Sequence, residues 1–132
     1  MKETPLFKSF EDLMGSNFED FNLKKINIFC LGQSDTQDIY MDLPVIFPSY
    51  PIFMQAPLMS PSQVETLTAC SPNTTFIFVP GITRSLGNSA LAFIIGFIRK
   101  VKTNSNFLMI TDRSSFDQIE FLPLLPLQVN IY

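Results

Sequence analysis

The sequence predicts a single α/β domain with a mainly parallel central sheet and flanking helices. Two short apolar runs, 74–79 and 107–111, are bounded by turn residues, as expected of strands buried on both faces. A helical pattern over 89–102 lies between them, so residues 74–111 form a predicted βαβ core. The chain has 132 residues, 46% of them hydrophobic and 16% charged, which is typical of one globular domain over 1–132.

The residues before this core predict three further elements. Residues 4–15 form an amphipathic pattern that begins with a Thr-Pro cap and ends at a glycine, which indicates a short helix. Residues 25–31 alternate with period two and predict a strand. Residues 38–47 are predicted to be extended as well, and Pro44 restricts them to an edge strand or a bulge. A loop interrupted by prolines follows over 48–59.

Two more elements complete the expected fold. Ser60 and Gln63 occupy capping-box positions at the start of a helix, with Val64 and Leu67 on its inner side. Residues 127–131 alternate again and predict a last strand. The prolines that precede this strand favour a position at the edge of the sheet.

The charge of the chain argues against nucleic-acid binding by the isolated protein. The net charge is −3, whereas neutralising several phosphates requires a basic face. The one local basic cluster, Arg99, Lys100 and Lys102, suits the C-terminal end of a helix, where cations complement the helix dipole. A contact with an acidic partner, or with RNA inside a larger assembly, is the alternative interpretation of this cluster.

Cysteine usage and hydropathy indicate an intracellular, soluble protein. Cys30 and Cys70 are predicted to be unpaired, buried thiols of a reducing compartment. Residues 1–15 carry charges among their apolar positions, unlike a signal peptide. The longest apolar run, 90–98, is too short to span a membrane as a helix.

The residue types of the chain predict no catalytic group, no metal site and no cofactor. It contains no His, the commonest general base and the commonest transition-metal ligand. A Ser–His–Asp or Cys–His nucleophile is therefore impossible within the chain, and no CxxC pair replaces a Cys–His zinc site. Chemistry by carboxylates alone, or by residues completed by another chain, stays open, so the expectation leans away from an enzyme.

One segment predicts a ligand site. Residues 81–89 follow a buried strand and open a helix, where backbone N–H groups and the helix dipole favour an anion. The segment looks like a degraded P-loop, with five residues between its glycines and an asparagine where that motif has lysine. The alternative is a plain connection between strand and helix. The candidate anion- or nucleotide-binding residues are Gly81, Arg84, Ser85, Gly87, Asn88 and Ser89.

Apolar material beyond the needs of a small core predicts an interaction surface. Large apolar side chains gather in the first predicted helix and in the loop 48–59, and such side chains are enriched at interface cores. Residues 1–15 are accordingly a possible docking helix. The expected function is a non-enzymatic structural or interaction subunit of a larger assembly, with a protein partner or a second copy of the chain. The candidate contact residues are Phe7, Phe10, Tyr50, Phe53 and Met54.

A third expectation comes from the order of motifs in the C-terminal part. The buried strand 75–79, the Ile110-Thr111-Asp112 turn and the segment Ile119–Pro123 follow one another along the chain. This layout over 73–130 is similar to the C-terminal half of the S-two family of small-subunit ribosomal proteins. The resemblance implies a component of a ribonucleoprotein assembly.

Overall fold

The computed structural model describes residues 25–32, 50–79, 88–111, 113, 117 and 127–131. The helix predicted over 4–15 and the strand predicted over 38–47 lie outside these residues. So do Gly81, Arg84, Ser85 and Gly87 of the predicted anion site, and Phe7 and Phe10 of the predicted interface.

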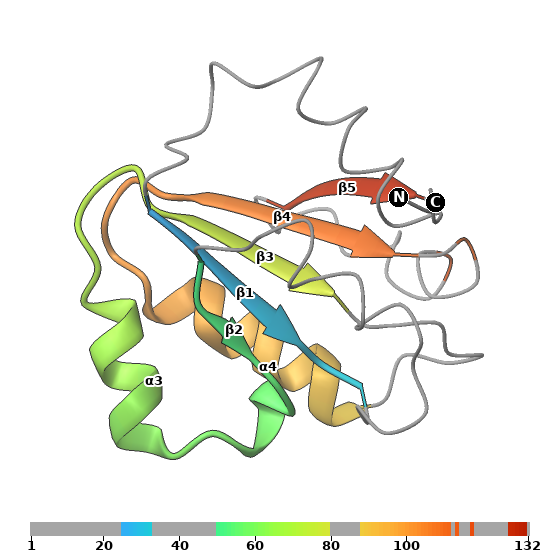
Figure 1. Ribbon diagram of the computed structural model, residues 1–132, viewed down its shortest axis with the longest axis horizontal. Coiled ribbons are helices and arrows are strands. Elements are labelled where there is room, and N and C mark those ends of the chain that lie inside the picture. The colour runs from blue at the N-terminus through green and yellow to red at the C-terminus, as the bar shows by residue number, and fades with distance from the viewer. Residues whose placement is uncertain are drawn as a thin grey trace.

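The described residues form a parallel β-sheet in the order β2-β1-β3-β4-β5 (Figure 1). Every neighbouring pair of strands runs parallel, which confirms the predicted parallel sheet and its βαβ core. This order is one of the two common in doubly wound α/β sheets. The strands are β1 (Ile26–Cys30), β2 (Ile52–Phe53), β3 (Thr75–Val79), β4 (Asn106–Thr111) and β5 (Gln128–Ile131).

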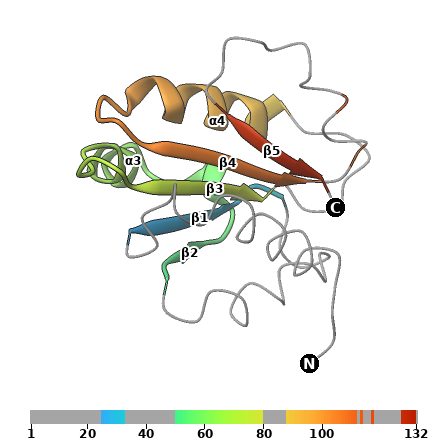
Figure 2. The same cartoon turned by 90° about the horizontal axis from the view of Figure 1, so that it is seen from above.

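Two helices, α3 (Pro61–Thr68) and α4 (Asn88–Lys100), lie on the same face of the sheet (Figure 2). As predicted, Ser60 caps α3, because its Oγ accepts a hydrogen bond from the backbone N–H of Gln63 at 3.3 Å. A short 3₁₀ helix, η4 (Ala56–Leu58), precedes α3. Neither helix is long and apolar enough to cross a membrane, nor is any other helix of the described residues.

The face of the sheet under α3 and α4, here called the helix face, is built largely from phenylalanine. Alternate residues of each strand point to it. Val64 and Leu67 of α3 pack against this core, as predicted. The buried residues that the strands and α4 contribute include Phe29, Phe76, Phe78, Phe107, Met109, Ile94 and Phe97.

The opposite face of the sheet carries aliphatic residues and no phenylalanine from β1, β3 or β4. The strand residues that alternate with those of the helix face point to this second face, and their apolar side chains are buried too. The sequence pattern of β3 and β4, apolar without interruption, therefore corresponds to strands buried on both sides. The buried hydrophobic residues of this second face are Ile26, Ile28, Cys30, Ile77, Val79, Leu108 and Ile110.

The structure differs from the sequence-based expectation at three places. The loop 48–59 contains β2 and η4, so it is more regular than its prolines suggested. The helix α4, whose sequence is apolar nearly all round and predicted cover on more than one side, leaves Ala92 exposed and Phe93 half-buried, although the Phe93 ring contacts Phe29. Cys70 is half-buried, whereas Cys30 is buried, and both thiols are free.

Candidate functional site

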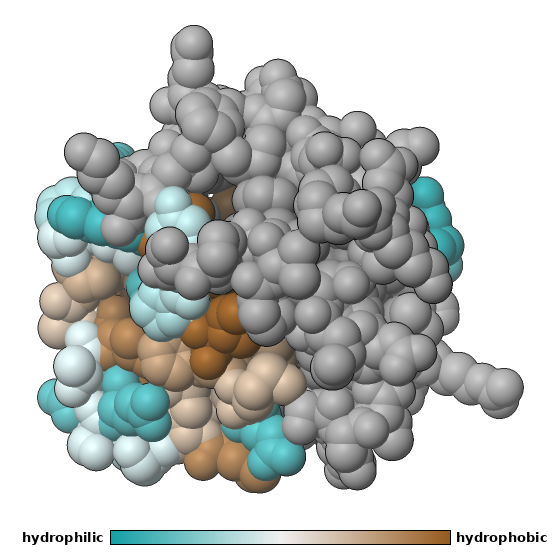
Figure 3. Space-filling model, viewed as in Figure 1, coloured by the Kyte–Doolittle hydropathy of each residue, from teal (hydrophilic) through white to brown (hydrophobic). Residues whose placement is uncertain are grey.

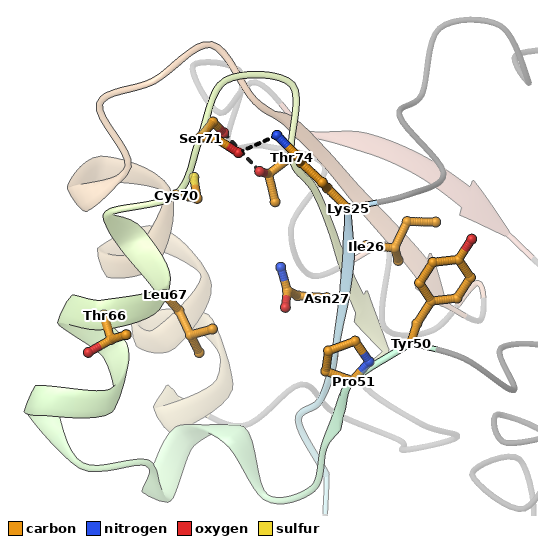
Figure 4. A pocket seen from close by; sticks show the side chains of 10 residues that line it. All are labelled: Lys25, Ile26, Asn27, Tyr50, Pro51, Thr66, Leu67, Cys70, Ser71 and Thr74. Carbon is orange, nitrogen blue, oxygen red and sulfur yellow. Dashed lines mark hydrogen bonds between the residues drawn. The ribbon is translucent and has the colours of Figure 1, made fainter.

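A pocket of about 430 Å³ lies at the amino ends of β1 and β3, beside α3 (Figure 4). Its volume falls in the range of small-molecule sites. Asn27 and Leu67 lie on one side of β1 in this view, and Ile26 and Tyr50 lie on the other. The pocket is lined by Lys25, Ile26, Asn27, Tyr50, Pro51, Thr66, Leu67, Cys70, Ser71 and Thr74.

The pocket exists because β2 is too short to cover the first half of β1. Ile28 donates its backbone N–H to the carbonyl of Pro51 at 3.1 Å. This bond shows which residues of β1 form hydrogen bonds with β2 in the parallel pair. In a parallel ladder of this phase, the next bond would run from the N–H of residue 51 to the carbonyl of Ile26. Proline has no N–H, so this hydrogen bond cannot form, and among the described residues β2 pairs with β1 only from Ile52 onward.

Three polar side chains of the pocket, those of Lys25, Ser71 and Thr74, meet at its upper end in Figure 4. The Lys25 ammonium donates to the Ser71 Oγ at 2.6 Å. The Thr74 hydroxyl donates to the Ser71 carbonyl at 2.8 Å, which ties the turn before β3 together. A backbone hydrogen bond of 2.8 Å from Thr75 to the carbonyl of Lys25 fixes the start of β1 against β3.

Cys70 and Asn27 complete the polar lining. The Cys70 Sγ lies 3.3 Å from the Thr103 Oγ1 and 3.6 Å from the Ser105 Oγ, so this thiol belongs to a small cluster of hydroxyl groups. Asn27 is half-buried, and its side-chain amide has no hydrogen-bond partner within the described residues. Since Asn27 interrupts an otherwise apolar strand, it is the one sequence signal that could have indicated this pocket.

The other thiol, Cys30, lies away from the pocket, on the face of the sheet opposite α3 and α4. Burial raises the pKa of Cys30 from 9.0 to about 12. A thiol of this kind stays protonated near neutral pH and is a poor nucleophile. Among the residues that the structure describes, no group of three or more His, Cys, Asp or Glu side chains could hold a metal ion.

The predicted anion-binding segment begins at the opposite end of the sheet. It connects Val79, the last residue of β3, to α4, and the described residues place Asn88 and Ser89 in the first turn of that helix. The strand order reverses between β1 and β3, whose carboxyl ends therefore form the topological switch point of the sheet. The rest of the segment, from Gly81 to Gly87, lies outside the described residues.

The predicted contact residues within the loop 48–59 divide between core and surface. Phe53 points to the helix face and stacks on Phe29 with ring centroids 5.5 Å apart. Tyr50 is half-buried and lines the pocket. Met54 is 41% exposed, and Leu58, which was not among the predicted contact residues, is 78% exposed.

Comparisons of the chain with protein-family models, with curated proteins and with solved structures found no match. The similarity in layout to the ribosomal S-two family therefore stays a prediction from the sequence.

Proposed function

We propose that the chain is a non-enzymatic interaction subunit that contacts a protein partner, or a second copy of itself, through residues 50–59. One observation carries the proposal. Met54 and Leu58 are the exposed large hydrophobic residues of the described chain, and both lie in this segment, which contains no charged residue. Figure 3 shows apolar surface over this part of the molecule, next to the polar surface of α3. Clustered apolar surface of this kind is typical of interface cores.

Residues 50–59 are held in place by contacts with the core of the domain, which favours binding of a partner. Phe53 is anchored on Phe29, and Ala56 is fully buried. The backbone N–H groups of Leu58 and Met59 bond to the carbonyls of Gln55 and Ala56 at 2.9 and 3.0 Å. Because the backbone is already ordered, a partner that covers the exposed side chains loses little conformational entropy.

The test compares the full chain with the double variant Met54→Ser, Leu58→Ser. We expect the chain to self-associate in light scattering, or to capture a defined protein from its native extract, and the double variant to lose that contact. The variant should keep its thermal midpoint because both side chains are exposed. Lys102→Ser, which alters an exposed residue elsewhere, is the matched control. If the variant associates and captures as the control does, the proposal is wrong.

A second candidate function is the binding of a small anion or nucleotide at Gly81–Ser89. The observation that favours it is the strand order, because open α/β sheets bind ligands outside the carboxyl ends of the strands at the switch point. Phosphate or ADP should then raise the melting temperature by mass action. Arg84→Ala should abolish the shift and Lys100→Ala should not. An unchanged midpoint at millimolar ligand would exclude this candidate.

A further inference from the structure

We propose that the pocket at the amino ends of β1 and β3 binds a small organic carboxylate that also carries an amide N–H. Its described lining does not include Met54 or Leu58. It also lies at the opposite end of β3 from Val79, the last described residue before the segment 81–89, so it adds a third binding feature. Three properties of the pocket support this assignment: its charge, the carbonyl of Ile26 that Pro51 leaves without a donor, and the side chains that line the rest of its walls.

The charge of the pocket is positive in a chain whose net charge is negative. Among the described residues that line it, Lys25 is the one charged residue, and none is Asp or Glu. Within the described residues, the Lys25 ammonium bonds only to the neutral hydroxyl of Ser71. Two of its three N–H donors are therefore left for a ligand. A single ammonium matches a monoanion, and charge-assisted hydrogen bonds to a carboxylate are stronger than neutral ones.

Strand β1 supplies an acceptor next to this cation. The carbonyl of Ile26 points toward the β2 side, as the bond from Ile28 to Pro51 shows for the residue two positions on. Because Pro51 cannot donate to it, no described residue of β2 occupies this carbonyl, and an N–H of a ligand can bond to it. A molecule with an amide N–H beside its carboxylate can therefore continue the ladder at Ile26 and reach Lys25 with its charged end.

The remaining lining fits the rest of such a molecule. The side-chain amide of Asn27 projects into the space between β1 and α3, where it can donate to and accept from polar groups of a ligand (Figure 4). Pro51 and Leu67 provide an apolar wall. A phosphate ester suits this pocket less well, because its double charge is usually met by Arg or by several backbone N–H groups, and the part of the lining that the structure describes holds no Arg.

The probe for the test is N-acetyl-L-leucine, which has one carboxylate, one amide N–H and an apolar side chain. We expect binding with a dissociation constant on the order of 1 mM, as for other ligands of this size. Shifts of backbone amide NMR signals should concentrate at residues 25–27 and at Ser71, Asn73 and Thr74. The ligand should also slow the alkylation of Cys70, which lines the pocket, and leave the buried Cys30 unaffected.

Two comparisons isolate the carboxylate. N-acetyl-L-leucinamide lacks the charge and should bind at least about tenfold more weakly, since it cannot form the charge-assisted bond to Lys25. Lys25→Gln should reduce affinity for the acid by a similar factor, Lys25→Arg should retain most of it, and Lys102→Gln should change nothing. Both lysines are exposed, so these variants leave the core intact.

The results that would overturn the proposal are specific. Equal binding of the acid and the amide, an unchanged affinity of Lys25→Gln, or tighter binding of phenyl phosphate would each contradict a carboxylate site here. NMR shifts confined to residues outside the pocket would contradict it too. An N-acyl amino acid has the same chemical groups as the C-terminal end of a peptide, so a pentapeptide with a free C-terminal leucine is tested as well. If the pentapeptide binds more tightly than N-acetyl-L-leucine, the site is assigned to peptide C-termini. If the two bind equally, it is assigned to small acids. None of these results depends on the contact at Met54 and Leu58.

Discussion

Phe29 of β1 and Phe97 of α4 meet edge to face, with ring centroids 4.9 Å apart and ring planes at 61°. Phe97 makes the same kind of contact with Phe76 of β3, also at 4.9 Å. One helical side chain thus joins two neighbouring strands to the helix. Aromatic pairs of this geometry contribute about 0.5–1.5 kcal/mol each beyond the burial of their area.

The first prediction concerns this contact. Phe97→Ala should lower the free energy of unfolding by about 3–5 kcal/mol, because it leaves a cavity between the helix and the sheet. Leu58→Ala, at a site that is 78% exposed, is the control and should change it by no more than about 0.5 kcal/mol. Urea denaturation followed by circular dichroism measures both. Equal midpoints for the two variants would contradict a core centred on Phe97.

The second prediction concerns alkaline pH. The pKa of Cys30 is raised from 9.0 to about 12 by burial, so the unfolded thiol releases its proton near pH 9 while the folded one keeps it. The contribution of Cys30 to stability is therefore complete below pH 9 and is lost as the pH rises toward 12. At about pH 10 the loss should reach about 1 kcal/mol. The free energy of unfolding should therefore fall less steeply between about pH 8 and 10 in Cys30→Ala than in the unchanged chain. Parallel curves of this free energy against pH for the two proteins would contradict the raised pKa.

The third prediction tests why β2 begins at Ile52. Pro51→Ala introduces an N–H at the position where the ladder needs a donor for the carbonyl of Ile26. The new amide should exchange slowly with deuterium, and the affinity of the pocket for N-acetyl-L-leucine should fall because the carbonyl is now occupied. Pro72→Ala, in an exposed turn, is the control whose new amide should exchange fast. Fast hydrogen exchange of the amide at residue 51 would show that the proline is not the reason why β2 begins at Ile52.

The fourth prediction compares two residues with left-handed backbones. Gln55 has φ = 49° and Asn73 has φ = 67°. Asparagine adopts this region at a lower energetic cost than glutamine, because the short amide of asparagine bonds locally. Gln55→Gly should therefore raise stability by about 0.5 kcal/mol, after the greater freedom of glycine in the unfolded chain is subtracted. Asn73→Gly should bring no gain, and thermal unfolding of both variants measures the difference.

The sequence predicted the elements that depend on local pattern. The alternation in β1, the uninterrupted apolar runs of β3 and β4, and the cap at Ser60 each lie within a few neighbouring residues, so the order of amino acids alone is enough to identify them. Their parallel arrangement followed from the order strand, helix, strand.

What the sequence could not predict depends on pairing at a distance. β2 has two residues and follows a proline, so nothing local distinguishes it from a loop; it is a strand because Ile52 and Phe53 align with Ile28 and Phe29. The pocket was missed for the same reason. Lys25 and Ser71 stand 46 positions apart, and they meet only once β1 and β3 are side by side.

The different side chains on the two faces of the sheet also limit where the chain can gain or lose residues. In β3, Phe76 and Phe78 face the helices while Ile77 and Val79 face away. One residue inserted inside the strand would exchange the two sets, removing the rings from α4 and forcing them into the space that now holds aliphatic side chains. One residue added between the elements leaves this parity untouched. Natural variation in length should therefore accumulate in the connections and be absent from the strands, and a library of single insertions selected for folding would show that distribution directly.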